Sequence, residues 1–338
     1  MNRERFNAVT SRYERLRIVV VGDYCLDRYL EIDPAREETS IETGLPVHNV
    51  VRVRAQPGGA GTILNNLAAL GAGEIWAVGF CGDDGEGYEL RRELGAMRNV
   101  RLEDFIMSGE CRTFTYCKPL VVEAGKAPVE LSRLDSKNWG ATPGAVVERM
   151  AAGLREVAPR ADAVVVLDQV DVGETGAVTR RLLEVIGELA ELYPGVPFIG
   201  DSRRGLRGWP RVSLKMNGAE LGAMMGGGGF AEDIEAVKAA ARKLAGRKGS
   251  SVFVTLAERG IVGADADGRV EYVEALPVRG AIDVVGAGDS VTANLAAALA
   301  GGGTMREAME MAILASSIVI HQLGTTGTAG VEDLRRLL

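Results

Sequence analysis

The sequence predicts an α/β protein in which a mostly parallel central sheet is flanked by helices and carries a small β lid. Short apolar runs rich in β-branched residues, such as 18–21, recur along the chain and alternate with segments that have one apolar helical face. Two segments, 29–54 and 111–134, break this alternation because they contain β-prone runs with no helix between them. Since α/β folds of this size often form one unit, we predict a single domain over residues 1–338.

The first predicted strand, 18–21, ends at Gly22-Asp23 and delivers a loop to the carboxyl edge of the sheet, where open α/β sheets usually bind ligands. A helix over 60–70 follows, because apolar residues recur there at helical spacing, and Gly71 ends it. Later strands are predicted over 75–79, 163–167, 197–200 and 251–255, later helices over 174–192 and 231–245, and lid strands over 50–53, 113–117 and 129–131. The run Gly226 to Gly229 has no strand before it and no Lys-Ser/Thr after it, so we expect a flexible helix connection.

Composition argues against several function classes. The formal charge is −7 and acidic and basic residues are interspersed, so no basic stripe is available for nucleic acid. The four cysteines form no C-x-x-C pair and only two histidines occur, which argues against a zinc site or a disulfide framework. No run approaches the ~18 apolar residues of a membrane span, and residues 1–17 lack an apolar signal core, so we expect a cytoplasmic protein with no membrane partner.

A small-residue turn, Gly286-Ala287-Gly288, precedes Asp289 and a long apolar helical run. Free backbone N–H groups and the positive end of the helix dipole meet at such a helix start, so the turn can hold phosphate oxygens. The same dipole should keep Asp289 ionised and ready to accept a proton from an attacking hydroxyl. Taken alone, the stretch could equally be a helix cap followed by a tightly packed glycine turn.

The stretch from Asp283 to Asp289, D-V-V-G-A-G-D, is similar to the C-terminal signature of the ribokinase-like (PfkB) carbohydrate kinases, D-T-x-G-A-G-D, and departs from it only at its second position. The segment from Pro57 to Gly61 and the later G-F-C-G-D-D-G from Gly79 resemble the N-terminal signature of the same family. This resemblance implies a ribokinase-like fold, an ATP-dependent sugar kinase, Asp289 as general base, and a phosphoryl group held by Gly286 to Gly288.

Two further segments extend the resemblance to the nucleotide side. Asn217-Gly-Ala-Glu220 resembles the family motif N-x-x-E, whose members help to organise Mg²⁺ and the phosphates through water; its alternative interpretation is a helix-start Asn with a first-turn Glu. Residues from Thr255 through Glu258 to Gly260 resemble the segment that lines the nucleotide, and 312–320 resembles the helix over the adenine.

Asp283 and the loop 324–327 lie where some relatives hold a monovalent cation such as K⁺, although a plain turn explains them equally well.

On the acceptor side, Asp27 resembles the family residue that binds the sugar, whereas Asp23 could instead cap the loop. The resemblance also implies that Gly58 and Gly59, in the glycine-rich turn, bind the acceptor. Within the family, the chain is most similar to D-glycero-D-manno-heptose 7-phosphate kinases, but Thr62 stands where those kinases have a sugar-contacting Asn.

Such an acceptor carries a phosphate of its own. Forked donors for that phosphate could come from any of four arginines, each of which could also be a surface residue: Arg112, Arg133, Arg203 and Arg204.

Three alternatives stay open. The acceptor could be a ketohexose, ribose or a nucleoside, and the chain could be a sugar-binding regulator on the kinase fold. A nicotinamide-dependent oxidoreductase is disfavoured because no G-x-G-x-x-G follows the first strand. Because short strands with exposed edges invite pairing, we also expect a homodimer formed through the β lid.

Overall fold

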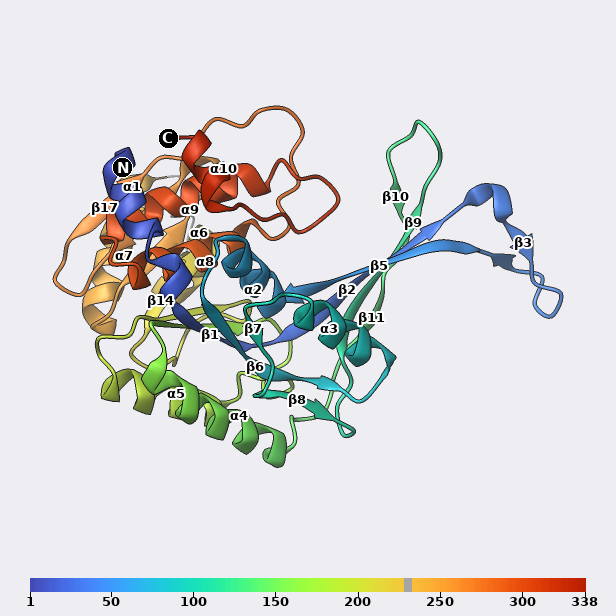
Figure 1. The fold of residues 1–338 in the computed structure, drawn as a ribbon, viewed down its shortest axis with the longest axis horizontal. Helices are drawn as coiled ribbons and strands as arrows, with labels where there is room; N and C mark the ends of the chain where they lie inside the picture. Colours follow the sequence, from blue (N-terminus) through green and yellow to red (C-terminus); the bar gives the residue numbers. More distant parts are fainter. Residues whose placement is uncertain (228–232) are drawn as a thin grey trace.

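The computed structural model describes residues 1–227 and 233–338, and it consists of an α/β core from which a smaller sheet projects (Figure 1). Of the predicted glycine connection, Gly226 is the left-handed end of a helix, whereas Gly228 and Gly229 lie outside the described residues. The first two residues of the helix predicted over 231–245 also lie outside them. No helix in the described part of the chain is long and apolar enough to cross a membrane.

The core sheet has ten strands among the described residues, in the order β17-β16-β15-β14-β13-β12-β1-β6-β7, with β8 beside β6. Their bounds are β1 (Arg17–Gly22), β6 (Glu74–Gly82), β7 (Val100–Arg101), β8 (Phe105–Ser108), β12 (Ala163–Asp168), β13 (Phe198–Ser202), β14 (Ser213–Asn217), β15 (Val252–Thr255), β16 (Ile261–Ala264) and β17 (Val270–Val273). Only β16 and β17 join antiparallel, so the predicted, mostly parallel sheet is confirmed.

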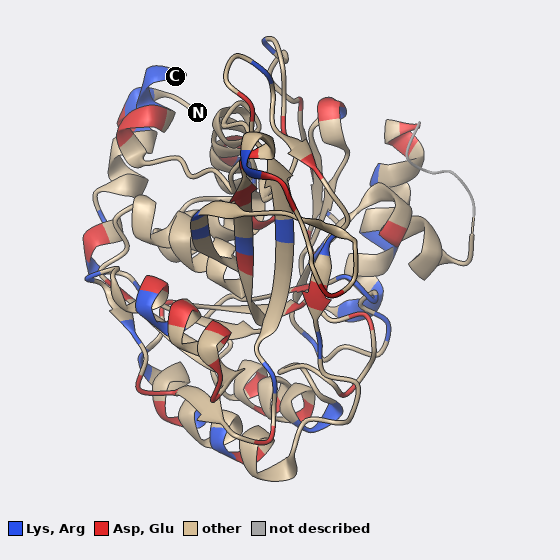
Figure 2. Ribbon diagram, turned by 90° about the vertical axis from the view of Figure 1, so that its right-hand side faces the viewer, with Lys and Arg blue, Asp and Glu red and all other residues tan. Residues whose placement is uncertain are grey.

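Helices cover both faces of this sheet, and Figure 2 shows Lys and Arg mixed with Asp and Glu along them. One face carries α1 (Arg3–Thr10), α2 (Ala60–Ala69), α3 (Gly85–Gly95), α8 (Ala287–Ala300), α9 (Met305–Val319) and α10 (Val331–Arg336); the other carries α4 (Gly144–Val157), α5 (Arg180–Leu192), α6 (Gly218–Met225) and α7 (Ile234–Lys248). Strand β1 shows why its sequence is apolar throughout: Ile18 and Val20 pack in one apolar cluster, Val19 and Val21 in the other, and all four are fully buried.

Most predicted elements are confirmed, but the helix predicted over 174–192 begins only at Arg180. The preceding segment serves as a loop instead, because the Ala177 N–H donates to the carboxylate of Asp23 at 2.6 Å. Glu174 has a φ of 66°, in the left-handed region, which a helix does not tolerate. Thr179 then caps the shortened helix by accepting from the Leu182 N–H.

The predicted β lid is present and larger than expected. It consists of β2 (Tyr24–Ile32), β5 (Val50–Gly59), β9 (Phe114–Val121), β10 (Val129–Glu130) and β11 (Leu134–Ser136), with a small outer hairpin of β3 (Glu38–Thr39) and β4 (Pro46–Val47). Figure 1 shows β2 and β5 running from the core out to that hairpin. The segment after β1, predicted as a loop, is therefore strand β2, which pairs with β5 and β9 along its length.

Candidate active site

The carboxyl ends of the parallel strands bring polar side chains to one edge of the core sheet. Asp23 follows β1, Asp168 ends β12, Asp201 lies near the end of β13, Asn217 ends β14 and Thr255 ends β15. The first turn of α8 lies over this edge, since the hydroxyl of Thr292 on α8 is 3.2 Å from an Asp201 oxygen. The edge is therefore where the predicted site residues meet.

The turn Gly286 to Asp289 has the predicted form. Gly286 is the N-cap of α8 with a left-handed φ of 80°, and Ala287 is the first helical residue. A Cβ atom at Gly286 would lie 3.3 Å from Thr326 and 3.4 Å from Thr62, so only a glycine fits without a shift. The Ala287 N–H donates to the Val284 carbonyl at 3.2 Å, so the turn offers the N–H groups of Gly286 and Gly288 to the carboxyl edge of the sheet.

The electrostatic expectation for Asp289 was wrong. The helix dipole was expected to keep this carboxylate ionised, but burial raises its pKa to about 7, and the negative charge of Asp201 adds to the rise. The charge of Lys215 opposes these effects without cancelling them. A carboxyl group that titrates near neutral pH suits a general base, because about half of it is ionised near pH 7 and it still binds a proton well.

Lys215 is a member of this site that the sequence interpretation missed. It lies on β14, is 7% exposed, and its Nζ is 2.7 Å from Asp201 Oδ2. A Cβ atom at Gly288 would lie 3.1 Å from the same Nζ. The only sequence signal was a charged residue inside the apolar strand that precedes Asn217.

Asn217 and Glu220 form a capping box at the start of α6. The Asn217 side chain accepts from the Glu220 N–H at 2.9 Å, and the Glu220 side chain accepts from the Asn217 N–H at 2.7 Å. The structure therefore shows the alternative interpretation of the motif, a helix-start Asn with a first-turn Glu, and it places Asn217 at the wall of a cavity. Burial raises the pKa of Glu220.

These two residues are the candidates for magnesium. In the described part of the chain no three potential metal ligands cluster, so an ion here would take most of its ligands from water and phosphate.

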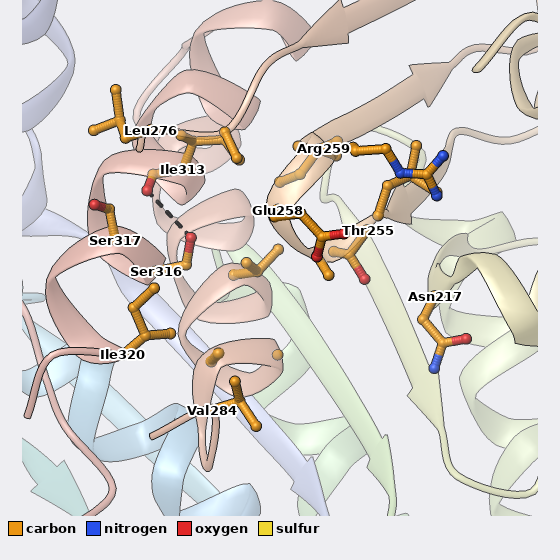
Figure 3. Close-up of a pocket in the computed structure, with 18 of the residues that line it drawn as sticks. Asn217, Thr255, Glu258, Arg259, Leu276, Val284, Ile313, Ser316, Ser317 and Ile320 are labelled. Carbon is orange, nitrogen blue, oxygen red and sulfur yellow. Dashed lines mark hydrogen bonds between the residues drawn. The ribbon is translucent and has the colours of Figure 1, made fainter. Parts of the chain in front are cut away.

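A cavity of about 610 Å³ adjoins the turn and is lined by most of the predicted nucleotide residues (Figure 3). Thr255, Glu258 and Gly260 line one side, and Ile313 and Ser316 of α9 line the opposite side. Gly260 has a φ of 100°, and a Cβ atom there would lie 2.0 Å from a carbonyl oxygen, so this turn needs a glycine. Apolar walls with a few polar groups fit a flat heteroaromatic ring better than a sugar.

Asp283 holds together the turn before α8. One of its carboxylate oxygens accepts from the Val285 N–H at 3.0 Å and the other from the Gly324 N–H at 3.1 Å. This geometry is that of a turn-capping carboxylate, the alternative to the predicted monovalent-cation site.

Asp27 lies on β2 and is only 7% exposed. Its Oδ1 forms an ion pair with Lys118 Nζ of β9 at 3.0 Å, which sequence reasoning missed because the partner comes from a distant strand. A Cβ atom at Gly58 would lie 2.5 Å from Asp27 Oδ2, so this glycine leaves room beside the carboxylate. The charge of Asp27 also contributes to the raised pKa of Asp289, after burial and the charge of Asp201.

The neighbouring acid, Asp23, has the alternative role that the sequence allowed. Its carboxylate is 3% exposed and accepts backbone N–H groups of Gln169, Val170 and Ala177. Gly59 packs on its carbonyl group, since a Cβ atom there would lie 2.5 Å from the Asp23 oxygen. Asp23 therefore fixes the loop beside the site.

Cationic side chains gather near Tyr116, which β9 places beside the acceptor carboxylate. The Arg133 guanidinium and the Lys137 ammonium lie 5.3 Å and 5.9 Å from the centre of its ring. Arg203 is 3.6 Å from Asp171, which Lys137 also contacts, at 2.7 Å. Two acids pair with these three cations, Asp135 with Arg133 and Asp171 with the other two.

The other predicted arginines are less available to a bound phosphate. Arg204 is committed to the buried carboxylate of Asp168 at 2.9 Å, and Arg112 is exposed. Arg133 itself is half exposed and pairs with Asp135. Thr62 is buried in the first turn of α2, with its methyl group facing Gly286.

A family model described as pfkB family carbohydrate kinase matches residues 212–330, which include β14, the nucleotide-side segment and the turn before α8. The Bifunctional protein HldE of Hyphomonas neptunium is 32% identical to the chain over 336 residues, which cover 99% of this chain and 66% of that protein. The chain belongs to the pfkB family of carbohydrate kinases. Phosphoryl transfer to an alcohol acceptor is the reaction class of this family.

A second relative of this pfkB-family chain has the same name and a similar level of identity. The protein of the same name from Azorhizobium caulinodans is 31% identical over 320 residues, which cover 93% of this chain and 63% of that protein. The chain thus spans about two thirds of the length of these curated relatives.

Solved structures confirm the predicted ribokinase-like fold. Phosphofructokinase-2 from Escherichia coli, in complex with substrates and products, superimposes with a TM-score of 0.70 at 19% identity over 95% of this chain and 97% of that one. Arabidopsis thaliana ribokinase, complexed with ribose and ATP, superimposes with a TM-score of 0.65 at 19% identity over 95% and 98%.

Proposed function

We propose that this pfkB-family chain transfers the γ-phosphoryl group of ATP to a hydroxyl group of a sugar phosphate. The observation that carries the proposal is the place of the α8 turn, which separates two sites. Ala287 and Gly288 line the nucleotide cavity. Asp289 belongs to the same turn, and the charge of Asp27 in the acceptor site contributes to its raised pKa. A phosphoryl group passing between the two sites would cross this turn.

The nucleotide would place its base between η5 (Ala257–Arg259) and α9. The apolar side chains of Leu276, Ile313 and Ile320 offer contact area to the ring (Figure 3). Its phosphates would then point to the start of α8, where free N–H groups favour anions.

The reaction needs one proton to be moved. As the acceptor oxygen forms its bond to the γ-phosphorus, the bond from that phosphorus to the β–γ bridging oxygen breaks and ADP leaves with the electron pair. The Asp289 carboxylate takes the proton of the acceptor hydroxyl, and the N–H groups of Gly286 and Gly288 stabilise the charge on the transferred phosphoryl group.

Mg²⁺, when bound, would neutralise charge on the β- and γ-phosphates. Asn217 and Glu220 would hold its hydration shell from the start of α6, where their capping box already fixes them.

For the acceptor we favour a sugar that already carries a phosphate. The cations near Tyr116, contributed by Arg133, Lys137 and Arg203, lie on the side of the site next to Asp27 and suit a dianion. The similarity to heptose 7-phosphate kinases points to a heptose 7-phosphate. Thr62 weighs against this acceptor because its short hydroxyl cannot replace an amide.

We also propose that two chains associate through their lids. The lid face opposite Asp27 exposes Val53, Val129 and Leu134, whose side chains are 48%, 59% and 65% exposed. An apolar sheet face of this kind, next to open strand edges, fits a second copy of itself.

ADP release from MgATP, measured over a panel of acceptors, tests the function. The panel should pair each sugar with its phosphate: heptose with heptose 7-phosphate, fructose with fructose 6-phosphate, and ribose with ribose 5-phosphate, with adenosine as a nucleoside. We expect turnover with one or more phosphorylated acceptors and little with their unphosphorylated partners. Tight sugar binding with no turnover on any acceptor would instead favour a regulator, and replacing K⁺ by tetramethylammonium in the same assay tests the cation predicted near Asp283.

A further inference from the structure

The most unusual group in the site is the buried ammonium of Lys215. Its strand alternates regularly: Leu214 and Met216 pack into the apolar cluster on one face of the sheet, so Lys215 faces the side of α8. The Lys215 side chain is 8% exposed, and the Asp201 side chain that pairs with it is 12% exposed.

A buried ion pair is weak evidence for stability, because desolvating two charges costs about as much as their attraction returns. Apolar residues of similar size would fill the same space at lower cost. The burial of this lysine therefore needs another reason.

The donors of Lys215 supply that reason. An ammonium group has three N–H donors, and Asp201 takes one at 2.7 Å. No other hydrogen bond of this Nζ occurs within residues 1–227 and 233–338. The ammonium with its two remaining donors lies next to Gly288, a residue that lines the nucleotide cavity.

Gly288 makes this approach possible. A methyl group at that position would lie 3.1 Å from the ammonium, closer than ordinary contact between such atoms. The second glycine of the turn therefore has a specific role, which is to let a cation approach the helix start.

We infer that Lys215 contacts the phosphate chain of the nucleotide from beneath the α8 turn, and that Asp201 and Thr292 are positioning residues that hold its ammonium there. This inference rests on the proposed kinase function and adds a cation to the site that this function uses.

The positioning comes from two elements. Asp201 and Lys215 stand on neighbouring parallel strands, directly after the paired residues Gly200 and Leu214. The Thr292 hydroxyl lies 3.2 Å from Asp201 Oδ2 and 3.1 Å from the Gly288 carbonyl oxygen, so it ties the carboxylate to α8. The cation is thereby fixed relative to the same turn that holds the phosphoryl group.

Binding calorimetry with the full chain tests the inference, because it needs no acceptor. MgADP, ADP without magnesium, and adenosine are titrated into wild type, Lys215→Met, Lys215→Arg and Asp201→Asn. Lys238→Met is the matched control: Lys238 also pairs with a carboxylate, at 2.7 Å, but on the surface of α7. Thr292→Val supplies a milder change should Lys215→Met fail to fold.

We expect Lys215→Met to weaken MgADP and ADP by about tenfold or more, the effect of losing a charged hydrogen bond, and adenosine by less than about twofold. Asp201→Asn and Thr292→Val should weaken ADP by about threefold, and Lys215→Arg should retain more affinity than Lys215→Met. The control should match wild type.

Equal losses for ADP and adenosine would show a structural lysine and overturn the inference, as would unchanged ADP binding in Lys215→Met or, if that variant fails to fold, in Thr292→Val. Wild type that binds neither ligand would instead refute the proposed kinase function itself.

Discussion

Replacing Asp289 by asparagine removes the proposed proton acceptor and, at the same time, a charge that the folded protein holds at a cost. The pKa of this carboxyl rises from 3.8 to about 7 in the folded state, chiefly through burial. At 1.36 kcal/mol per pKa unit, the difference amounts to about 4 kcal/mol. The same substitution should therefore lower activity and raise stability.

The sign follows from proton binding. Below pH 3.8 both states are protonated and the carboxyl costs nothing. Between pH 3.8 and about 7 the unfolded chain loses its proton while the folded chain keeps it, so wild-type stability falls as pH rises. Above about pH 7 the ionised carboxylate destabilises the folded wild type by the full amount, whereas the asparagine variant carries no such charge.

Two assays follow. Thermal unfolding without ligands should show the Asp289→Asn variant melting about 6 °C above wild type at pH 8 and only about 2 °C above it at pH 5, from an unfolding entropy of about 2.1 cal/mol/K per residue. ADP release with the true acceptor should fall by about 10²- to 10⁴-fold, and wild-type kcat/KM should rise with pH up to about 7 and then level off. Asp267→Asn, on an exposed turn, is the matched control and should alter neither property.

A stability difference that is equal at both pH values would refute the electrostatic reasoning. Near-normal ADP release by Asp289→Asn would refute its role as the base.

Three further predictions concern the acceptor, the loop and the lid. Asp27→Asn and Lys118→Met should each raise the acceptor KM by about tenfold and change the ATP KM by less than about twofold, because both groups lie on the lid side of the turn. Equal changes in both KM values in steady-state kinetics would argue against this assignment. Asp23→Ala should lower the free energy of unfolding in urea by about 2 to 4 kcal/mol, since three backbone N–H groups lose their acceptor. A smaller loss would mean that water replaces the carboxylate as acceptor. We expect wild type to sediment as a dimer at micromolar concentration and the double variant Val53→Asp with Leu134→Glu to sediment as a monomer. A variant that sediments like a wild-type dimer would place the interface elsewhere.

The sequence was sufficient for the features that depend on local pattern. Strand β1 was predictable because a parallel strand buried on both faces must be apolar at every position, as residues 18–21 are. The turn Gly286 to Asp289 was predictable because a left-handed residue at a helix start requires glycine.

Features that depend on distant partners were not predictable. The helix predicted from residue 174 begins later than expected, because the Ala177 N–H donates to the buried carboxylate of Asp23. Lys118 and Lys215 become visible only when other strands bring Asp27 and Asp201 beside them. The raised pKa of Asp289 has the same origin, since burial and a neighbouring charge outweigh the helix dipole that the sequence revealed.

Strand β2 has a mechanical consequence. It is one strand that holds Asp27 near its core end and lid residues at its far end. It pairs with β5 and β9 as far as Ile32, and its register with β5 shifts only between Glu31 and Ile32. The lid therefore cannot swing about a loose joint; any tilt must bend β2 and turn the carboxylate of Asp27. Subunit association at the lid and acceptor affinity would then be thermodynamically coupled, so that an acceptor gripped by Asp27 would tighten the dimer to the same degree that the dimer tightens the acceptor.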